Sequence, residues 1–205
     1  GYYFFRFHFT PQYPHEPPKV KFMTNGGNVR FNPNLYTDGK VCISLLNTWS
    51  GEQWTSCQNI SSILLTLCSL LNENPLLNEP DVKSDDKDIP NYNKLLEYAN
   101  FNIAICDVLN KCSYIHNEET QFMELFDDVV LDHFTKNYQK HLKKIHNMIA
   151  NCVSKSKTKT IHIPSYDYKG KLDYLHLLSK MRLTKSLLIN KEQNQKQEQE
   201  QKSLI

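Results

Sequence analysis

The chain has 205 residues, of which 40% are hydrophobic and 11% aromatic, so it is long enough for one domain with a buried core and an extension. Its formal net charge of +2 argues against a general nucleic-acid binder, because no strongly basic face is implied. No apolar run approaches a membrane span, no signal-peptide pattern opens the chain, and the six cysteines show neither a CxxC pair nor a disulfide-dense spacing. We therefore expect a soluble protein of a reducing compartment, cytoplasmic or nuclear, without membrane or nucleic-acid partners.

Two short strands are predicted near the start of the chain. Residues 2–9 alternate aromatic and polar side chains, and residues 19–23 alternate likewise, so each segment is predicted to be a half-buried strand. A turn is expected at residues 25–28, where two glycines lie between asparagines. The segment that follows, residues 32–47, shows no periodicity and is expected to be irregular.

Helices dominate the middle of the chain. The first is expected to begin at a cap on Asn59 or Ser61, to end near Leu71 and to form the buried centre of the domain. Prolines and an acidic cluster predict a loop over residues 72–90, and apolar spacing predicts a second helix over residues 91–109.

The last part of the chain is predicted to be an extension. Apolar side chains repeat on one helical face through residues 118–153, which indicates a long amphipathic helix packed on the domain, with a partner-binding or coiled-coil helix as the alternative. Residues 154–205 are expected to form a linker and a low-complexity, partly disordered tail. Within that tail, residues 191–202 contain only Lys, Glu, Gln and Asn, which cannot bury enough apolar area to offset ordering entropy. The predicted core thus spans residues 1–117.

One loop presents a cysteine among residues that fix the backbone. Pro33 restricts its own φ, and Asn34, Asp38 and Gly39 tolerate tight or left-handed turns. Cys42 follows and leads into an apolar run that can anchor the loop against a core. The pattern is typical of a reactive thiol, but most intracellular cysteines are small buried hydrophobes without chemistry. On this loop alone, both interpretations of Cys42 stay open.

Further motifs accompany this loop in a fixed order. They are Tyr13-Pro14, Pro17-Pro18, the turn Asn32-Pro33-Asn34, Cys42 eight residues after Asn34, Trp49, Trp54 and Asn74-Pro75. In this order and spacing, about residues 1–110 resemble the catalytic domain of the ubiquitin-conjugating enzymes, the UBC family. The residue sequence of the loop resembles that of a divergent branch of the family, which includes the conjugating domain of the giant apoptosis inhibitor called BRUCE or Apollon.

The resemblance implies an α+β fold, the UBC fold, in which an antiparallel β-meander packs on helices, followed here by a long C-terminal helical extension. Family members begin with a helix and two strands that have no counterpart before residue 2. The aromatic edge at residues 2–9 would then be exposed. We therefore expect either a fragment of a longer chain or a C-terminal helix that covers part of the gap.

The resemblance also implies an enzyme. It would accept ubiquitin, or a ubiquitin-like modifier, from an activating enzyme as a thioester on Cys42 and pass it to a lysine of a substrate protein or to a ubiquitin ligase, without a cofactor or metal ion. Sulfur suits this task because it is both a competent nucleophile and a good leaving group. Asn34 is implied either to stabilise the oxyanion or to hold the loop in shape. The alternative function is a non-catalytic UBC-type scaffold that binds ligases or ubiquitin without being charged.

The resemblance assigns the acidic residue that orients the incoming lysine to Glu79. Asn78 is a second candidate, because this loop is longer than the family pattern and the alignment shifts by a residue. A solvated loop carboxylate is the other interpretation of Glu79. Two departures lie nearer the cysteine: Ser44 stands where many relatives have an aspartate, and Asn32 replaces the histidine that braces the turn.

Two loops are implied to form the ligase-binding surface. The predicted surface residues are His15, Pro17, Trp54, Thr55, Ser56 and Cys57.

Two other cysteine chemistries are disfavoured. The histidines at 116, 133, 141 and 146 carry no protease signature, and Cys106, Cys112 and His116 have a spacing that fits no standard zinc site.

Overall fold

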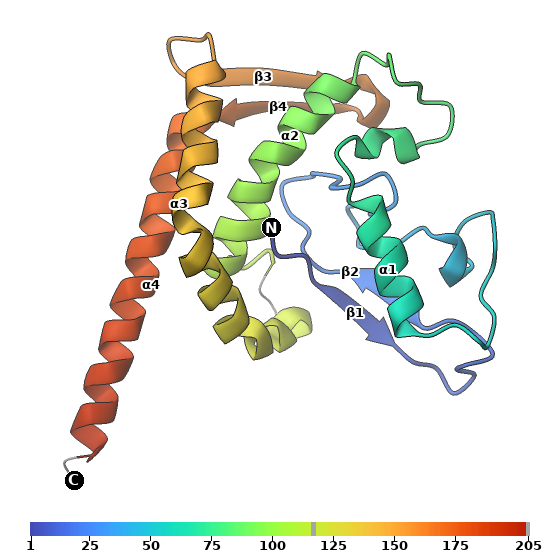
Figure 1. Cartoon of the computed structure of the whole chain (residues 1–205), viewed down its shortest axis with the longest axis horizontal. Coiled ribbons are helices and arrows are strands. Elements are labelled where there is room, and N and C mark those ends of the chain that lie inside the picture. Colours follow the sequence, from blue (N-terminus) through green and yellow to red (C-terminus); the bar gives the residue numbers. More distant parts are fainter. Residues whose placement is uncertain (116–117, 204–205) are drawn as a thin grey trace.

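The structure, a computed structural model, describes residues 1–115 and 118–203. The elements in chain order are β1 (Phe5–His8), β2 (Lys19–Phe22), α1 (Ile60–Leu70), α2 (Ile89–Phe101), α3 (Asp127–Asn151), β3 (Thr158–Ile163), β4 (Tyr168–Asp173) and α4 (Tyr174–Ser203). Figure 1 shows α2 between two groups, with β1, β2 and α1 on one side and α3 and α4 on the other. The fold is therefore α+β, as predicted, while the predicted domain boundary at residue 117 lies outside the described residues.

The two predicted N-terminal strands are confirmed as an antiparallel hairpin, in which Phe5 lies opposite Phe22. Aromatic rings hold this hairpin to the core: the Phe22 ring packs 5.3 Å from Phe5 and 6.2 Å from Phe31, measured between centroids. The chain before β1 is covered by the C-terminal part, because the Phe4 ring packs 5.8 Å from Phe126 and the Tyr2 ring 5.7 Å from His133. The helical extension thus covers part of this edge.

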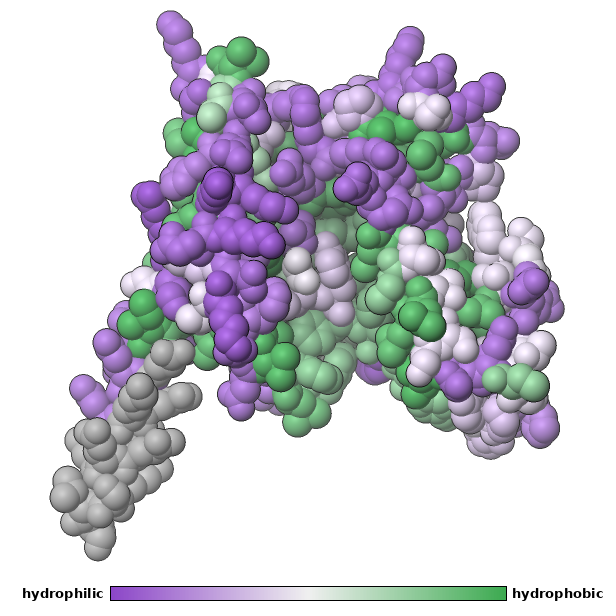
Figure 2. Space-filling model, in the orientation of Figure 1, coloured by the Kyte–Doolittle hydropathy of each residue, from purple (hydrophilic) through white to green (hydrophobic). Residues whose placement is uncertain are grey.

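Helix α1 begins as predicted, because Asn59 caps it through a reciprocal pair of bonds with Ser62. Its predicted place at the centre of the domain is wrong. Only Ile63 and Leu67 are buried, whereas Leu65 is 72% exposed. The apolar side chains surround the helix, and one stripe alone reaches the core. Figure 2 shows apolar side chains exposed on the surface over α1, as well as in other places.

The buried centre is α2 instead. Tyr92, Leu95, Ala99 and Phe101 are all buried on this helix. The helix continues into a π-helical turn over Asn102–Asp107, where four consecutive apolar residues are also buried. The predicted helix over residues 91–109 is therefore confirmed in type, with a change of winding near its end.

Helix α3 packs on the domain, as interpreted from its apolar stripe, but the predicted bounds of 118–153 are wrong. Glu118–Phe126 form a 3-10 helix, and the α-helix begins at Asp127 and ends at Asn151. Val130, Phe134, Ile145 and Met148 are buried along 25 residues of helix. Val129, near its first turn, remains 68% exposed. Within the described residues, no helix combines the length and apolar character that crossing a membrane requires.

The structure differs from the predicted linker and tail. Residues 158–173 form the antiparallel hairpin β3–β4, and α4 continues for 30 residues. Ile161, Ile163 and Leu172 are almost completely buried, and Figure 1 shows this hairpin running across the end of α2. The segment folds because these few apolar side chains gain a core that other elements supply, which the Lys/Ser/Thr-rich sequence conceals.

A buried ion pair fastens α4 to the π-helical turn. The Lys180 Nζ lies 2.6 Å from the Asp107 Oδ1, and the side chain of Asp107 is only 3% exposed. Lys180 also donates to the Asn102 Oδ1 at 2.7 Å, and Asn110 donates to Thr184 at 3.0 Å. Helix α4 is thereby joined to the core by polar bonds as well as by apolar packing.

Candidate active site

The loop that carries Cys42 is closed by two hydrogen bonds between the same two residues. The Cys42 amide donates to the Asn34 carbonyl at 2.9 Å, and the Asn34 Nδ2 donates back to the Cys42 carbonyl at 2.7 Å. Thr48 adds bonds on both sides of the cysteine, accepting from the Ile43 amide at 3.0 Å and donating to the Val41 carbonyl at 2.8 Å. Hydrogen bonds thus fix the backbone of Cys42 and of the residues on either side of it.

Asn32 braces the turn from below. It is fully buried, its Oδ1 accepts from the Asn34 amide at 2.9 Å, and its Nδ2 donates to the Leu70 carbonyl at the end of α1 at 2.7 Å. The bracing that the resemblance assigns to a histidine is therefore carried out here by an amide, which contacts both the loop and the helix.

The Asn34 side chain has hydrogen-bonding groups that are not in use. One of its two Nδ2 hydrogens is used on the Cys42 carbonyl, and its Oδ1 is buried without a hydrogen-bond partner among the described residues. This geometry supplies the shape-holding role directly. It also leaves the second Nδ2 hydrogen able to donate.

The cysteines differ sharply in access. Cys42 is only 3% exposed, whereas Cys57 and Cys68 lie on the surface. Burial raises the pKa of both the Cys106 and the Cys112 thiol to about 11, which disfavours their thiolates near neutral pH. Of the three cysteines at positions 42, 57 and 68, Cys42 alone is buried.

Asn78 and Glu79 lie at the end of a short 3-10 helix, Pro75–Asn78, and reach the same turn by two routes. Asn78 Nδ2 donates to the Leu70 carbonyl at 3.3 Å, the acceptor that Asn32 also uses. Glu79 Oε1 lies 3.4 Å from the Arg30 Nη2, and Arg30 donates to the Pro33 carbonyl. One guanidinium therefore connects the carboxylate to the cysteine-bearing loop.

Glu79 is also bonded to the C-terminal extension. The Tyr166 hydroxyl, in the turn between β3 and β4, donates to the Glu79 Oε1 at 2.8 Å. With two partners and a side chain 24% exposed, Glu79 is not the freely solvated carboxylate of the alternative interpretation.

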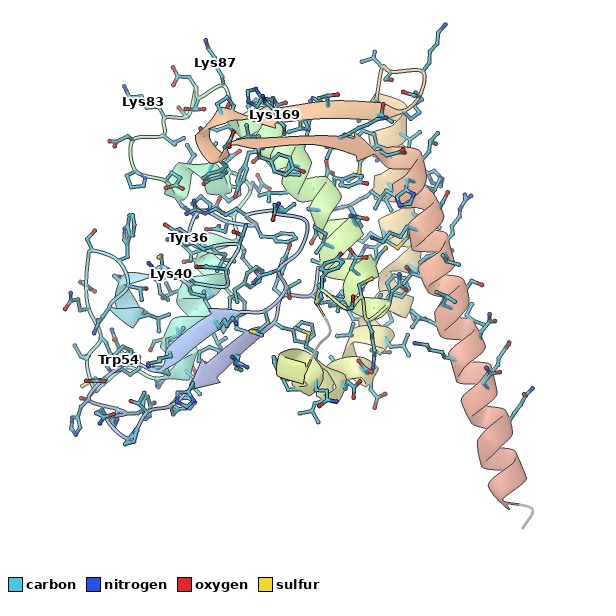
Figure 3. The ribbon with its side chains drawn as sticks, turned by 180° about the vertical axis from the view of Figure 1, so that it is seen from behind. Tyr36, Lys40, Trp54, Lys83, Lys87 and Lys169 are labelled. Atoms are coloured by element: carbon cyan, nitrogen blue, oxygen red, sulfur yellow. The ribbon has the colours of Figure 1, made fainter. Side chains whose placement is uncertain are left out.

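The predicted ligase-binding loops lie together. The Trp54 indole donates to the Pro14 carbonyl at 2.7 Å, and its ring lies 6.0 Å from that of Tyr13. Trp54 itself is buried, and Pro17 is half-buried. The exposed members of this surface are His15, Thr55, Ser56 and Cys57. Figure 3 shows Trp54 at the end of the domain remote from Lys169 in the β3–β4 hairpin.

Sequence reasoning missed two residues of the site. Arg30 stands two residues before Asn32, but nothing in the local pattern gives it a role. Tyr166 lies 87 residues after Glu79, inside a segment predicted as a tail. Only the folded hairpin brings Tyr166 to the site.

The disfavoured chemistries gain no support from the described residues. His133 contacts Tyr2, and the His141 ring packs 5.6 Å from that of Phe101. Within residues 1–115 and 118–203, no group of three His, Cys, Asp or Glu side chains is placed to hold a metal ion. His116 lies outside the described residues.

The chain is similar to known proteins over its first half. Residues 1–98 match the family described as ubiquitin-conjugating enzyme. Ubiquitin-conjugating enzyme E2 Z of Homo sapiens is 46% identical over 116 residues, which cover 55% of this chain and 33% of the relative. The Xenopus tropicalis E2 Z is 42% identical over 135 residues, covering 62% and 43%.

The predicted branch is supported in part. The Homo sapiens dual E2 ubiquitin-conjugating enzyme/E3 ubiquitin-protein ligase BIRC6 is 46% identical over 86 residues, which cover 39% of this chain and 2% of that protein. The chain thus spans less than half the length of each of these relatives. The segment that matches the ubiquitin-conjugating enzyme family, residues 1–98, contains the Cys42 loop.

Proposed function

We propose that this chain carries ubiquitin or a ubiquitin-like modifier as a thioester on Cys42. The thiolate of Cys42 attacks the modifier's C-terminal carbonyl on the activating enzyme and displaces that enzyme's thiolate. A lysine amine of a substrate protein, or a ligase cysteine, then attacks the new thioester and Cys42 leaves as a thiolate. The observation that carries the proposal is the reciprocal pair of hydrogen bonds between Asn34 and the backbone of Cys42. These bonds hold the cysteine beside the Asn34 amide.

Asn34 has two complementary roles in this proposal. Its bond to the Cys42 carbonyl holds the loop, and its second Nδ2 hydrogen can donate to the oxyanion that forms when the thioester is attacked. The buried Asn34 Oδ1 makes no bond that would turn the amide away. A single side chain thus serves both the shape of the loop and the transition state.

Glu79 is proposed to orient the incoming lysine and to accept its proton, with Asn78 holding the end of the loop to α1. The bond of Asn78 to the Leu70 carbonyl supports a bracing role for that residue. His15, Pro17, Trp54 and residues 55–57 are proposed to receive a ligase, and the reaction is proposed to take place in the cytoplasm or nucleus.

A second function is favoured by one observation. Cys42 is 3% exposed, and a scaffold that binds ligases or ubiquitin without being charged would tolerate a covered thiol. The two functions differ in a single measurable step, which is formation of the thioester.

The test is a charging assay with activating enzyme, ATP and ubiquitin. We expect an adduct that a thiol reductant removes, an adduct on Cys42→Ser that resists the reductant because an oxyester replaces the thioester, and normal charging of Cys68→Ser, whose thiol is exposed on α1. If no reductant-sensitive adduct forms, or if Cys42→Ser leaves the adduct unchanged, the thioester-carrier function is wrong and the scaffold function replaces it.

A further inference from the structure

The tip of the β3–β4 hairpin lies on the loop that carries Glu79. Tyr166 donates from its hydroxyl to the Glu79 Oε1 at 2.8 Å, and its ring packs 5.3 Å from that of Tyr92 on α2. The Arg30 guanidinium lies over the same ring, 4.8 Å from its centroid. Glu79, Arg30 and the tip of the hairpin therefore form one contact cluster.

Independent bonds hold the hairpin tip in this place. Ser165 donates to the Asp88 Oδ2 from both its amide, at 3.1 Å, and its hydroxyl, at 2.5 Å. Asn91 donates to the His162 carbonyl at 3.3 Å. These bonds place Tyr166 beside Glu79 even when the phenol itself is removed.

Arg30, on the other side of the cluster from the hairpin, is also held in place. Arg30 stacks on Tyr36, with its guanidinium carbon 3.9 Å from the ring centroid, and Tyr92 donates to the Arg30 carbonyl at 2.6 Å. Burial raises the pKa of the Tyr166 phenol above its usual range, so the hydroxyl remains a donor near neutral pH. Figure 3 shows Tyr36 on the same side of the molecule as Lys169 of the hairpin.

The contacts are distributed unevenly over the carboxylate. Within the part of the chain that the structure describes, the bonds of the Glu79 side chain to Tyr166 and Arg30 both end on Oε1. A carboxylate offers about four acceptor positions on its two oxygens, so Oε2 keeps its capacity for a further donor. An ammonium or amine is such a donor.

We propose that Tyr166 is a positioning residue for the lysine step, which rests on the proposed function of Glu79. Tyr166 and Arg30 anchor Oε1, so that Oε2 is held at a fixed orientation for the incoming amine. When that amine attacks the thioester, a C–N bond forms, the C–S bond to Cys42 breaks, and the amine's proton passes to the carboxylate and then to water. The C-terminal hairpin thereby contributes to lysine transfer and leaves the charging of Cys42 unaffected.

The two kinds of acceptor provide a readout that a structural role would not produce. A lysine amine is largely protonated near neutral pH and must lose a proton, whereas a thiol acceptor reacts as its thiolate. A defect in Glu79 positioning therefore slows transfer to lysine more than transfer to cysteine. A general loss of loop order slows both.

The experiment uses the charged protein after the activating enzyme has been quenched, chased with free lysine or free cysteine. Tyr166→Phe removes only the hydroxyl, and Tyr168→Phe is the matched control, since the Tyr168 hydroxyl forms no hydrogen bond that the structure records in its described residues. We expect Tyr166→Phe to charge normally, to discharge to cysteine at the wild-type rate, and to discharge to lysine about tenfold more slowly. In a Glu79→Ala background the same substitution should have no further effect.

Equal rates for Tyr166→Phe and Tyr168→Phe with lysine would overturn the inference, as would an equal slowing with lysine and cysteine. An additional loss in the Glu79→Ala background would also contradict it, because Tyr166 would then act on another group. Failure of the wild-type protein to charge at all would instead remove the proposed function, so the two failures are distinguishable.

Discussion

At the scale of single residues, three asparagine amides contribute to holding the reactive loop, beside the Thr48 hydroxyl and the Arg30 guanidinium. Asn34 bonds the Cys42 carbonyl, and Asn32 and Asn78 share the Leu70 carbonyl as an acceptor. The role of Asn32 as a brace was predictable from its place in the turn. Its acceptor was not, because Leu70 lies 38 residues away on another element.

The covered position of Cys42 predicts an order of alkylation. In the native protein near neutral pH, iodoacetamide should label the exposed Cys57 and Cys68 at least about tenfold faster than Cys42, and should label Cys106 slowly because its pKa is raised to about 11. Mass spectrometry of tryptic peptides over time measures these rates. Labelling in urea, where all six thiols are exposed, is the control, and native labelling of Cys42 before Cys68 would contradict the covered geometry.

At the scale of elements, prediction succeeded where periodicity is local. The strands Phe5–His8 and Lys19–Phe22 and the helix Asp127–Asn151 follow alternating or helical patterns that residues carry within a short stretch. The hairpin at residues 158–173 was missed, because its exposed strand positions are Thr160, His162, Lys169 and Lys171 and only Ile161 and Ile163 are buried on the first strand. Two apolar residues are too weak a signal without the helices they pack on.

Helix α4 should depend on its buried ion pair. Lys180→Met leaves the Asp107 carboxylate, which is 3% exposed, without its cation, and we expect a loss of about 3 kcal/mol in the free energy of unfolding. Urea denaturation followed by circular dichroism measures this change. The control is Arg182→Met, an exposed position on the same helix, which should stay within about 0.5 kcal/mol of the wild type. Equal effects of the two substitutions would show that the pair does not stabilise the fold.

At the scale of the whole molecule, the family motifs predicted the α+β domain of the first half, whereas the way the extension folds back was not predictable. Motif order fixes the Cys42 loop because all of its parts lie within about 110 residues. The bond between Tyr166 and Glu79 spans 87 residues and has no local signature in either partner. Long-range polar contacts of this kind become visible only in the folded chain.

Global stability should also depend on pH through His141 on α3. Burial between Phe101 and Phe134 lowers the pKa of His141 to about 4, from an ordinary value of 6.5. Nearby cationic groups lower this pKa further: the N-terminal amino group, His133, Lys144 and Lys140 all disfavour the imidazolium. Between pH 6.5 and pH 4 the unfolded chain binds the proton and the folded chain does not, so the stability contributed by this group falls as the pH is lowered through that range.

Melting temperatures measured from pH 7 to pH 4 test this expectation. His141→Phe should reduce the decline seen for the wild type, because the group that takes up a proton on unfolding is gone. His146→Phe, at an exposed position on the same helix, should leave the decline unchanged. Identical slopes for wild type and His141→Phe would rule out His141 as the source.

The fully buried Ile161, Ile163 and Leu172 have a consequence for how this protein can be divided. The family match ends at residue 98, within α2, but the hairpin that covers the end of that helix begins at Thr158. A chain cut after the matched segment would lose the last three residues of α2, the π-helical turn that continues it and the hairpin that covers its other end. The boundary of the family match is therefore not a boundary at which the polypeptide could be separated, because the extension completes the core of the same folded unit.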